Sequence, residues 1–394
     1  MRDRLSRVSR LRGLPGIGVD RVGAAADAAA QSGRDLLRLE NLDTDLRPPE
    51  AALEATRAAV ARDDVNSYLP FTGQAELRLA AARHVARLSG VAYDPARQCL
   101  ITAGGTNGCL ATLLAILEPG DEVVMTDPTY VGMINRVRIA GGVPALVPFL
   151  WEGRSWRLDR DALRRAVTPR TKAMFLMSPS MPSGAVLDRA EWDTVADLCR
   201  EADLWLVYNA AMERILYDGT PYLHPAGLAG MADRTITVGS VSKEFRMIGW
   251  RVGWVVGPAA ILADIGLAAI SDSVTPVGIA QPAAAAALEA PDGDADLASA
   301  VARWKRRRDC LIEELDGFDL RRADGGWSML LDVGQVGRTG EEASSALLER
   351  ERIAATPMRH WGERNGPRFL RLVFSNEPVE RLRGVGERFR RALA

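Results

Sequence analysis

The sequence predicts an α/β fold in which a mostly parallel seven-stranded sheet forms a large domain and a smaller α+β domain accompanies it. Between residues 100 and 260, short β-branched or apolar runs alternate with longer amphipathic stretches, the pattern of a parallel sheet covered by helices. After Pro258 the pattern changes to alanine-rich helix, and from Leu320 onward short strands return. A chain of 394 residues, 47% of them hydrophobic, is long enough to bury both cores.

Strands of the large domain are expected where an apolar or β-branched run lies between turn-forming residues. The expected strands are residues 99–103, 122–127, 143–148, 173–177, 205–208, 235–239 and 253–257. The linking helices or turns are expected at residues 111–117, 130–140, 189–202 and 228–234.

After Pro258, helices are expected at residues 283–288 and 298–315. The last part, from Leu320, is expected to form the smaller domain together with the N-terminal segment, with strands at residues 328–333, 353–357 and 369–374 and a closing basic helix from Glu377. Residues 49–294 are therefore assigned to the large domain, and residues 1–48 and 295–394 to the small domain.

Composition excludes several classes of protein. Fifty basic residues against fifty-one acidic ones give a formal charge of −1, which provides no electrostatic footprint for nucleic acid. No apolar stretch approaches the roughly 18 to 20 residues that cross a bilayer, so no membrane segment is expected. The four cysteines have no paired spacing, which favours a reducing cytoplasm over a disulfide framework.

Other polar groups give weaker signals. His84, His224 and His360 lack the spacing of a metal site, so no metal is expected, and His84 is assigned a solvated or capping role. The basic run "KRRR" at residues 305–308 is expected to be a solvated helix face, balanced by neighbouring acidic residues.

The stretch "GSVSKEFRMIGWRVGW", residues 239–254, carries the strongest chemical signal. Lys243 follows an expected buried strand and precedes Arg251, and both desolvation and a nearby cation lower the pKa of a lysine. Ser240, Ser242 and Arg251 together could hold a phosphate. A reactive lysine beside a phosphate site indicates pyridoxal 5'-phosphate (PLP), whereas a surface lysine in an ion pair would leave these neighbours unexplained.

A second stretch, "TAGGTNG" at residues 102–108, ends an expected strand and opens an apolar helix. The backbone amides of Gly105 and Thr106 would face an anion at the helix N-terminus, where the dipole favours negative charge. Alone this turn is a weak motif, but with Ser240 and Arg251 it predicts a phosphate-binding cup.

The lysine stretch resembles the active-site signature of the fold type I, class I/II aminotransferases, in which Ser-x-Ser-Lys is followed by Gly-x-Arg-x-Gly. Three further elements are similar to family motifs and follow in the family's order. They are "YLPFTGQAELR" (residues 68–78), "EPGDEVVMTDPTY" (118–130) and "FLRLVF" (369–374). The resemblance covers nearly the whole chain and implies a PLP-dependent aminotransferase that acts on an α-amino acid and a keto acid.

The resemblance also implies roles for single residues. Lys243 would form the Schiff base with PLP, Tyr130 would stack on its ring unless it is a core residue, and Tyr68 would reach the phosphate of a neighbouring subunit in a homodimer. Arg371 would bind the substrate carboxylate. An arginine between Leu370 and Leu372 in an apolar strand also needs a buried partner, because an unpaired buried charge is costly.

Two stretches depart from the family pattern. "SPSMPSG" (residues 178–184) has Met181 in place of an asparagine that donates to the phenolic oxygen of PLP. "NAAME" (209–213) has Asn209 in place of the aspartate at the ring nitrogen and Met212 in place of a second, tyrosine donor. An asparagine cannot keep the ring protonated, so the carbanion formed at the substrate should be less stable.

Three hypotheses therefore stay open at this point. The protein is a transaminase with a weaker electron sink; or it is a PLP enzyme of the same fold that catalyses elimination, decarboxylation, cyclisation or oxidation of an amino acid; or it is a non-catalytic ligand-binding homologue. The retention of Lys243, Arg251, Ser240 and Arg371 disfavours the last of these.

Overall fold

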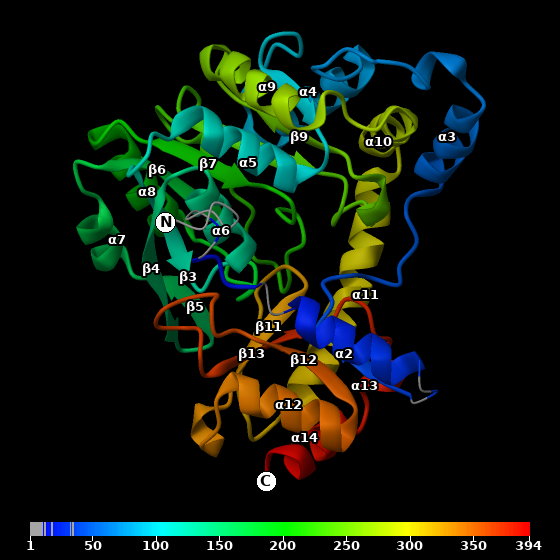
Figure 1. The fold of residues 1–394 in the computed structure, drawn as a ribbon, viewed down its shortest axis with the longest axis vertical. Coiled ribbons are helices and arrows are strands. Elements are labelled where there is room, and N and C mark those ends of the chain that lie inside the picture. The colour runs from blue at the N-terminus through cyan, green and yellow to red at the C-terminus, as the bar shows by residue number, and fades with distance from the viewer. Residues whose placement is uncertain (1–10, 12, 17–18, 32, 34) are drawn as a thin grey trace, which may run out of the picture.

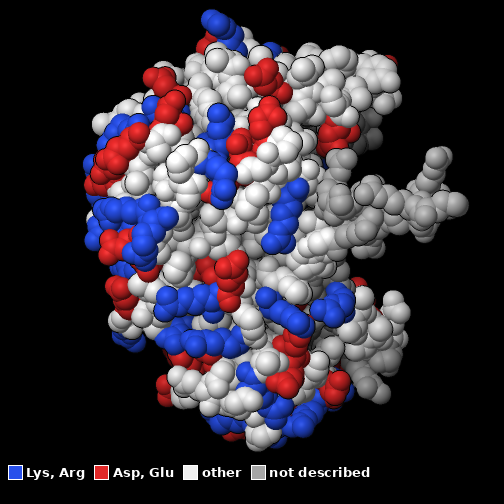
Figure 2. Space-filling model, turned by 60° about the vertical axis from the view of Figure 1, so that its left-hand side comes forward, with Lys and Arg blue, Asp and Glu red and all other residues white. Residues whose placement is uncertain are grey.

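A computed structural model describes residues 11, 13–16, 19–31, 33 and 35–394. The described chain forms a large α/β domain and a small α+β domain, and the long helix α11 (Gly293–Glu314) runs between them (Figure 1). Among the described residues, no helix is both long and apolar enough to span a bilayer. Acidic and basic side chains are interspersed on the face shown in Figure 2, so neither sign of charge dominates there.

The large domain is built on a mixed sheet of eight strands. Its order is β2 (Cys99–Thr102), β9 (Gly253–Val256), β8 (Thr235–Ser240), β7 (Trp205–Asn209), β6 (Thr171–Met177), β3 (Glu122–Asp127), β4 (Val143–Glu152) and β5 (Ser155–Leu158). The five strands from β8 to β4 are mutually parallel, whereas β9 runs antiparallel to β8 and β2, and β5 antiparallel to β4.

The expectation of seven strands is corrected to eight. All seven expected strands are present, but β4 continues to Glu152 and turns back as β5, a strand that the sequence pattern did not reveal. The reason is that β5 has four residues, "SWRL", and follows the charged turn "EGR", so its alternation of buried Trp156 and Leu158 is too short to stand out.

Helices cover both faces of the large sheet because successive strand residues point to opposite sides. On β3, Val123 and Met125 join one apolar cluster with α5 (Gly105–Ile116), α6 (Val131–Ile139) and α9 (Ala259–Ser273). Val124 joins a different cluster with α7 (Arg160–Ala166) and α8 (Arg189–Glu201). The helices α3 (Glu50–Val60), α4 (Ala75–Ser89) and α10 (Gln281–Leu288) pack against β2 and β9. The sheet is thus buried on both sides.

The small domain contains a five-stranded sheet and several helices. Its strand order is β1 (Leu37–Leu39), β12 (Ile353–Pro357), β13 (Phe369–Val373), β11 (Ser328–Asp332) and β10 (Asp319–Arg321). Its other helices are α2 (Val19–Gln31), α12 (Gly340–Glu351), α13 (Val379–Leu382) and α14 (Val385–Leu393). The expected closing helix is therefore two helices, separated at Gly384, whose φ of 76° lies in the left-handed region.

The N-terminal segment reaches the small sheet through β1, which pairs in parallel with β12. This pairing agrees with the expected packing of the segment, although residues 1–10, 12, 17–18, 32 and 34 lie outside the described residues. The helix α11 begins at Gly293, close to the assigned boundary at residue 295. The boundaries themselves stay a prediction.

Candidate active site

A cavity of about 300 Å³ lies at the carboxyl ends of the central parallel strands, where ligands bind in open α/β sheets. Strand β7 ends at Asn209, β8 ends at Ser240, and Tyr130 follows the end of β3. The small domain contributes Arg371 from β13. The lining residues include Gly105, Thr106, Tyr130, Met181, Asn209, Met212, Ser240, Ser242, Lys243, Arg251 and Arg371. Every predicted site residue except Tyr68 thus meets at one cavity, while their roles stay predictions.

Lys243 stands just past the end of β8, in the middle of the cavity wall. Its ammonium Nζ donates a hydrogen bond to the backbone carbonyl of Leu42 at 2.8 Å and lies 5.0 Å from the ring centre of Trp327. Burial lowers the pKa of Lys243 to about 8; the Asp43 carboxylate opposes this shift, and the cations Arg371 and Arg251 add to it. A measurable share of the amine is therefore neutral near physiological pH.

The predicted phosphate cup is assembled from two segments that are distant in sequence. Helix α5 begins at Gly105, so its free N–H groups point into the cavity beside the Ser240 side chain. The guanidinium of Arg251 lies against the same turn and donates to the Ser242 hydroxyl at 3.4 Å. Gly104 makes this approach possible: its φ is 82°, and a Cβ there would lie 2.5 Å from Nη2 of Arg251. These groups form an electropositive, donor-rich corner.

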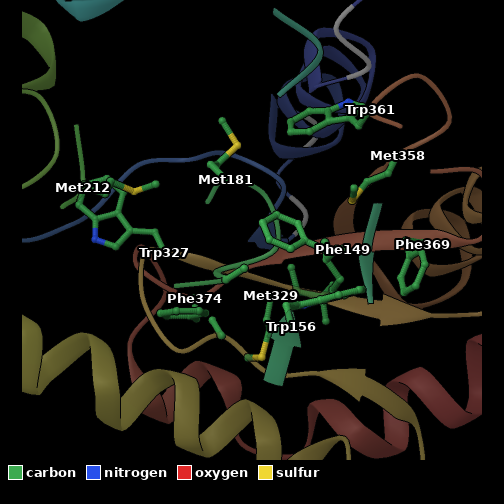
Figure 3. Packing of buried hydrophobic residues seen from close by; sticks show 14 of the residues in the cluster. Phe149, Trp156, Met181, Met212, Trp327, Met329, Met358, Trp361, Phe369 and Phe374 are labelled. Atoms are coloured by element: carbon green, nitrogen blue, oxygen red, sulfur yellow. The ribbon is translucent and has the colours of Figure 1, made fainter. Parts of the chain in front are cut away.

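Asn209, Met181 and Met212 also line the cavity. Asn209 Oδ1 accepts a hydrogen bond from the backbone N–H of Ala211 at 3.2 Å. Met181 and Met212 belong to the same buried apolar cluster as Trp327 (Figure 3). Their thioethers bring no N–H or O–H donor to this wall. The substitutions read from the sequence therefore face the cavity and are not remote from it.

Arg371 is a buried cation, with 1% of its surface exposed. Its Nη2 donates to the Glu40 carbonyl and, at 3.1 Å, to the Thr356 hydroxyl, while Nη1 lies 3.9 Å from the sulfur of Met181. Burial lowers its pKa to about 10. The expected buried partners are thus neutral groups, and no carboxylate of the described residues forms an ion pair with Arg371. A buried guanidinium without a counter-ion is a strong binding group for an anion.

The two predicted tyrosines differ in position. Tyr130 lines the cavity at the start of α6, and its ring centre lies 5.3 Å from that of Trp361. Tyr68 is 84% exposed and lies outside the cavity of its own chain.

Two groups that contact Lys243 were not predicted from the sequence to lie beside it. The Leu42 carbonyl accepts the hydrogen bond of the amine. The ring of Trp327 is fully buried and faces Nζ. Both belong to segments far from residue 243, so no local pattern could have revealed them.

The sequence matches the aminotransferase class I and II family over residues 36–388. The chain belongs to this family. Enzymes of this family are PLP-dependent transferases of fold type I, and the protein is accordingly an aminotransferase that acts on amino acids and keto acids. Its resemblance to the family signature is thereby confirmed at the level of the whole chain.

Two relatives and one solved structure illustrate this membership. The chain is 38% identical over 315 residues to a probable N-succinyldiaminopimelate aminotransferase, DapC, of Mycobacterium tuberculosis, covering 79% of this chain and 78% of the relative. It is 36% identical over 360 residues to the arginine–pyruvate transaminase AruH of Pseudomonas aeruginosa, covering 89% of each. The structure of N-succinyldiaminopimelate aminotransferase from M. tuberculosis superposes with a TM-score of 0.91 at 34% identity, covering 99% of this chain and 100% of that one.

Proposed function

We propose that this aminotransferase binds PLP in the cavity at the strand ends, with Lys243 as the covalent anchor. One observation supports this proposal: three groups line the same cavity. They are the Lys243 amine with its lowered pKa, the donor-rich corner at the N-terminus of α5, and the buried Arg371. These groups fit an aldehyde, a phosphate and a substrate carboxylate. The exceptions are the aspartate acceptor that the family has at the ring nitrogen and its two donors to the phenolic oxygen, because this chain has Asn209, Met181 and Met212 at those sequence positions.

The phosphate would be held by the amides of Gly105 and Thr106, the hydroxyl of Ser240 and the guanidinium of Arg251. Backbone N–H groups, a hydroxyl and an arginine fork are the usual donors to phosphate oxygens. Tyr130 presents an aromatic face to the ring. When bound, PLP supplies an electrophilic carbonyl carbon and a conjugated ring that accepts electron density from the Cα of the substrate.

The residues of the chain supply binding and proton movement. Arg371 binds and orients the α-carboxylate, a task for which its planar fork is suited and a lysine is not. Lys243, once its amine is free, would take the proton from the Cα of the substrate and return it to the cofactor carbon that had been the aldehyde carbon. Its lowered pKa supports this role, because a base works best when its pKa is close to the operating pH.

We propose further that the active unit is a homodimer in which Tyr68 reaches the cavity of the partner. In support, large apolar side chains are exposed in two segments: Tyr68 and Phe71 in one, and Val274, Val277 and Ile279 in the other. These two segments meet, because Gly278 packs against the backbone of Val65. Exposed apolar surface of this kind marks protein interfaces.

We also propose that the protein works in a reducing compartment such as the cytoplasm. The four cysteines are free and buried, and burial raises the pKa of Cys99, Cys109 and Cys199 to about 12, which keeps these thiols unreactive.

The test uses the purified protein loaded with PLP and a panel of amino acids with a keto-acid acceptor. We expect a new keto acid and a new amino acid in equal amounts, and loss of the visible absorbance of the lysine-bound cofactor in Lys243→Ala. Lys172→Ala, which changes an exposed lysine, serves as the matched control and should retain both. Absorbance that persists in Lys243→Ala would exclude the anchor. Ammonia, carbon dioxide or peroxide in place of the keto acid would favour a different PLP reaction.

A further inference from the structure

The orientation of the Asn209 amide is fixed by its own backbone. The Oδ1 atom accepts the N–H of Ala211 at 3.2 Å, and a backbone N–H can only donate. The carbonyl end of the amide is therefore the end that faces Ala211. Asn209 lines the cavity, and its Nδ2 group is left without a hydrogen-bond partner among the described residues, so it is free to donate to a ligand there.

The charges around the cavity add a second, independent observation. Three cations, Lys243, Arg251 and Arg371, line the cavity, and no carboxylate of the described residues does. Two carboxylates act on these cations from outside the cavity lining: Asp43 opposes the lowering of the pKa of Lys243, and Glu40 opposes that of Arg371. A cationic ring in the cavity would thus meet three cations in the lining and no carboxylate in direct contact with its nitrogen.

We propose that Asn209 donates its Nδ2–H to the pyridine nitrogen of PLP and thereby selects the ring in its unprotonated, neutral form. The inference depends on the proposed function, in which PLP occupies this cavity with its ring nitrogen at Asn209. A protonated nitrogen would place two N–H donors against each other. Turning the amide over to accept that proton would leave the Ala211 N–H facing a second donor, so either arrangement loses a hydrogen bond.

A neutral ring makes removal of the Cα proton depend more on the other residues of the site. A ring without positive charge withdraws less electron density from the substrate, and the thioethers of Met181 and Met212 donate nothing to its phenolic oxygen. Removal of the Cα proton should then be a slow step, and its rate should depend strongly on the position and basicity of Lys243. Asn209 is in this account a cofactor-binding residue that sets the charge of the ring.

The test compares the affinity of the cofactor-free protein for PLP and for two analogues. N-methyl-PLP carries a permanent positive charge and no lone pair, and 1-deaza-PLP has a C–H in place of the nitrogen. We expect the wild type to bind PLP roughly tenfold or more tightly than either analogue, the effect of one lost hydrogen bond and an unpaired amide. Asn209→Asp should prefer N-methyl-PLP, because a carboxylate pairs with the cationic ring.

Two controls separate charge from shape. Asparagine and aspartate have the same shape, so a steric clash of the methyl group would weaken binding equally in the wild type and in Asn209→Asp. Asn41→Asp introduces the same carboxylate at another wall of the cavity and should move the preference toward N-methyl-PLP much less than Asn209→Asp, because it adds negative charge without pairing with the ring nitrogen.

The outcomes are distinct for the two proposals. If none of the compounds binds, the proposed function fails. If PLP binds but the wild type prefers N-methyl-PLP or binds it equally well, the inference about Asn209 fails while the function stands. A second measurement needs no variant: the ¹⁵N chemical shift of PLP labelled at the ring nitrogen should report an unprotonated nitrogen in the wild type between pH 6 and 8, and a protonated signal would overturn the inference.

Discussion

The lowered pKa of Lys243 can be tested directly, because the chain contains only three lysines, Lys172, Lys243 and Lys305. The folded pKa of about 8 lies about 2.5 pH units below the ordinary value of 10.5. At pH 7 the neutral fraction of the Lys243 amine should then be about 10%, roughly 300 times that of an ordinary lysine. Only the neutral amine reacts with an acylating reagent.

The assay is acetylation of the cofactor-free protein at a series of pH values, with the modification of each lysine measured by mass spectrometry. Lys172 is exposed and serves as a reference, and the hydrogen bonds of Lys305 to Asp309 and Asp218 raise its pKa. We expect the modification of Lys243 to rise with a midpoint near pH 8, and that of Lys305 to rise at a pH above the ordinary value. Acetic anhydride is small enough to enter a cavity of about 300 Å³.

Two substitutions should move this midpoint in opposite directions. Arg371→Leu removes a cation that lowers the pKa of Lys243, so the midpoint should rise, whereas Asp43→Asn removes a carboxylate that raises it, so the midpoint should fall. Each shift should be roughly 0.5 to 1 unit, because burial, the largest cause, is retained in both variants. A Lys243 midpoint at or above that of Lys172 would refute the argument that the cavity favours the neutral amine.

Three further outcomes follow from the contacts of the site. Arg371→Lys should raise the KM for the amino acid about 10- to 100-fold with a smaller change in kcat, measured by steady-state kinetics, since a lysine cannot make the bidentate contact. Met181→Ala should tighten competitive inhibition by small carboxylates several-fold, because the Met181 sulfur covers Nη1 of Arg371 at 3.9 Å; unchanged inhibition constants would show that this cover is irrelevant. Gly104→Ala should weaken PLP binding at least about tenfold by displacing Arg251. Gly120→Ala, at a φ of 97° with open space around it, is the control for backbone strain alone and should bind PLP normally.

The parts of the fold that could be predicted are those that local sequence determines. The central strands are buried on both faces, so each appears as a run of apolar residues whatever its neighbours are. The turn before α5 and the residues around Lys243 have short, chemically specific patterns, and they meet because parallel strands end at one edge of the sheet. The three-residue strands β1 and β10 were not predicted, since they depend on partners from other parts of the chain.

The buried polar residues were also hard to predict, because their environment depends on distant parts of the chain. His84 was expected to be solvated or to cap a helix, but it is 4% exposed and lies 4.0 Å from the Glu213 carboxyl, with the rings of Phe245 and Trp254 at its edges. This prediction was wrong because the sequence around a single histidine does not show whether that histidine lies on the buried or the exposed face of α4.

The basic run at residues 305–308 was likewise only partly a solvated face. Arg307 and Arg308 are both buried, and their partners Asp45 and Asp218 lie in other segments, 262 and 90 residues away in the sequence. Pairs at such separations carry no local signal, and an arginine with a distant carboxylate looks the same in the sequence as one in water. The same reason explains why the Leu42 carbonyl was not foreseen as the partner of Lys243.

One physical cause links the lysine and the asparagine. Burial is the largest cause of the lowered pKa of Lys243; Asp43 opposes it, and Arg371 and Arg251 add to it. Burial and the two arginines, in a cavity that no described carboxylate lines, would act in the same direction on a pyridine nitrogen, which the donor end of Asn209 also keeps unprotonated. The phosphate of the cofactor and the carboxylate of the substrate would neutralise the two arginines. Each anion would then pair with its own arginine. PLP binding should therefore change the affinity for a carboxylate ligand that lacks an amino group very little. A large change in that affinity, measured by calorimetry with and without PLP, would show that the two charges act together.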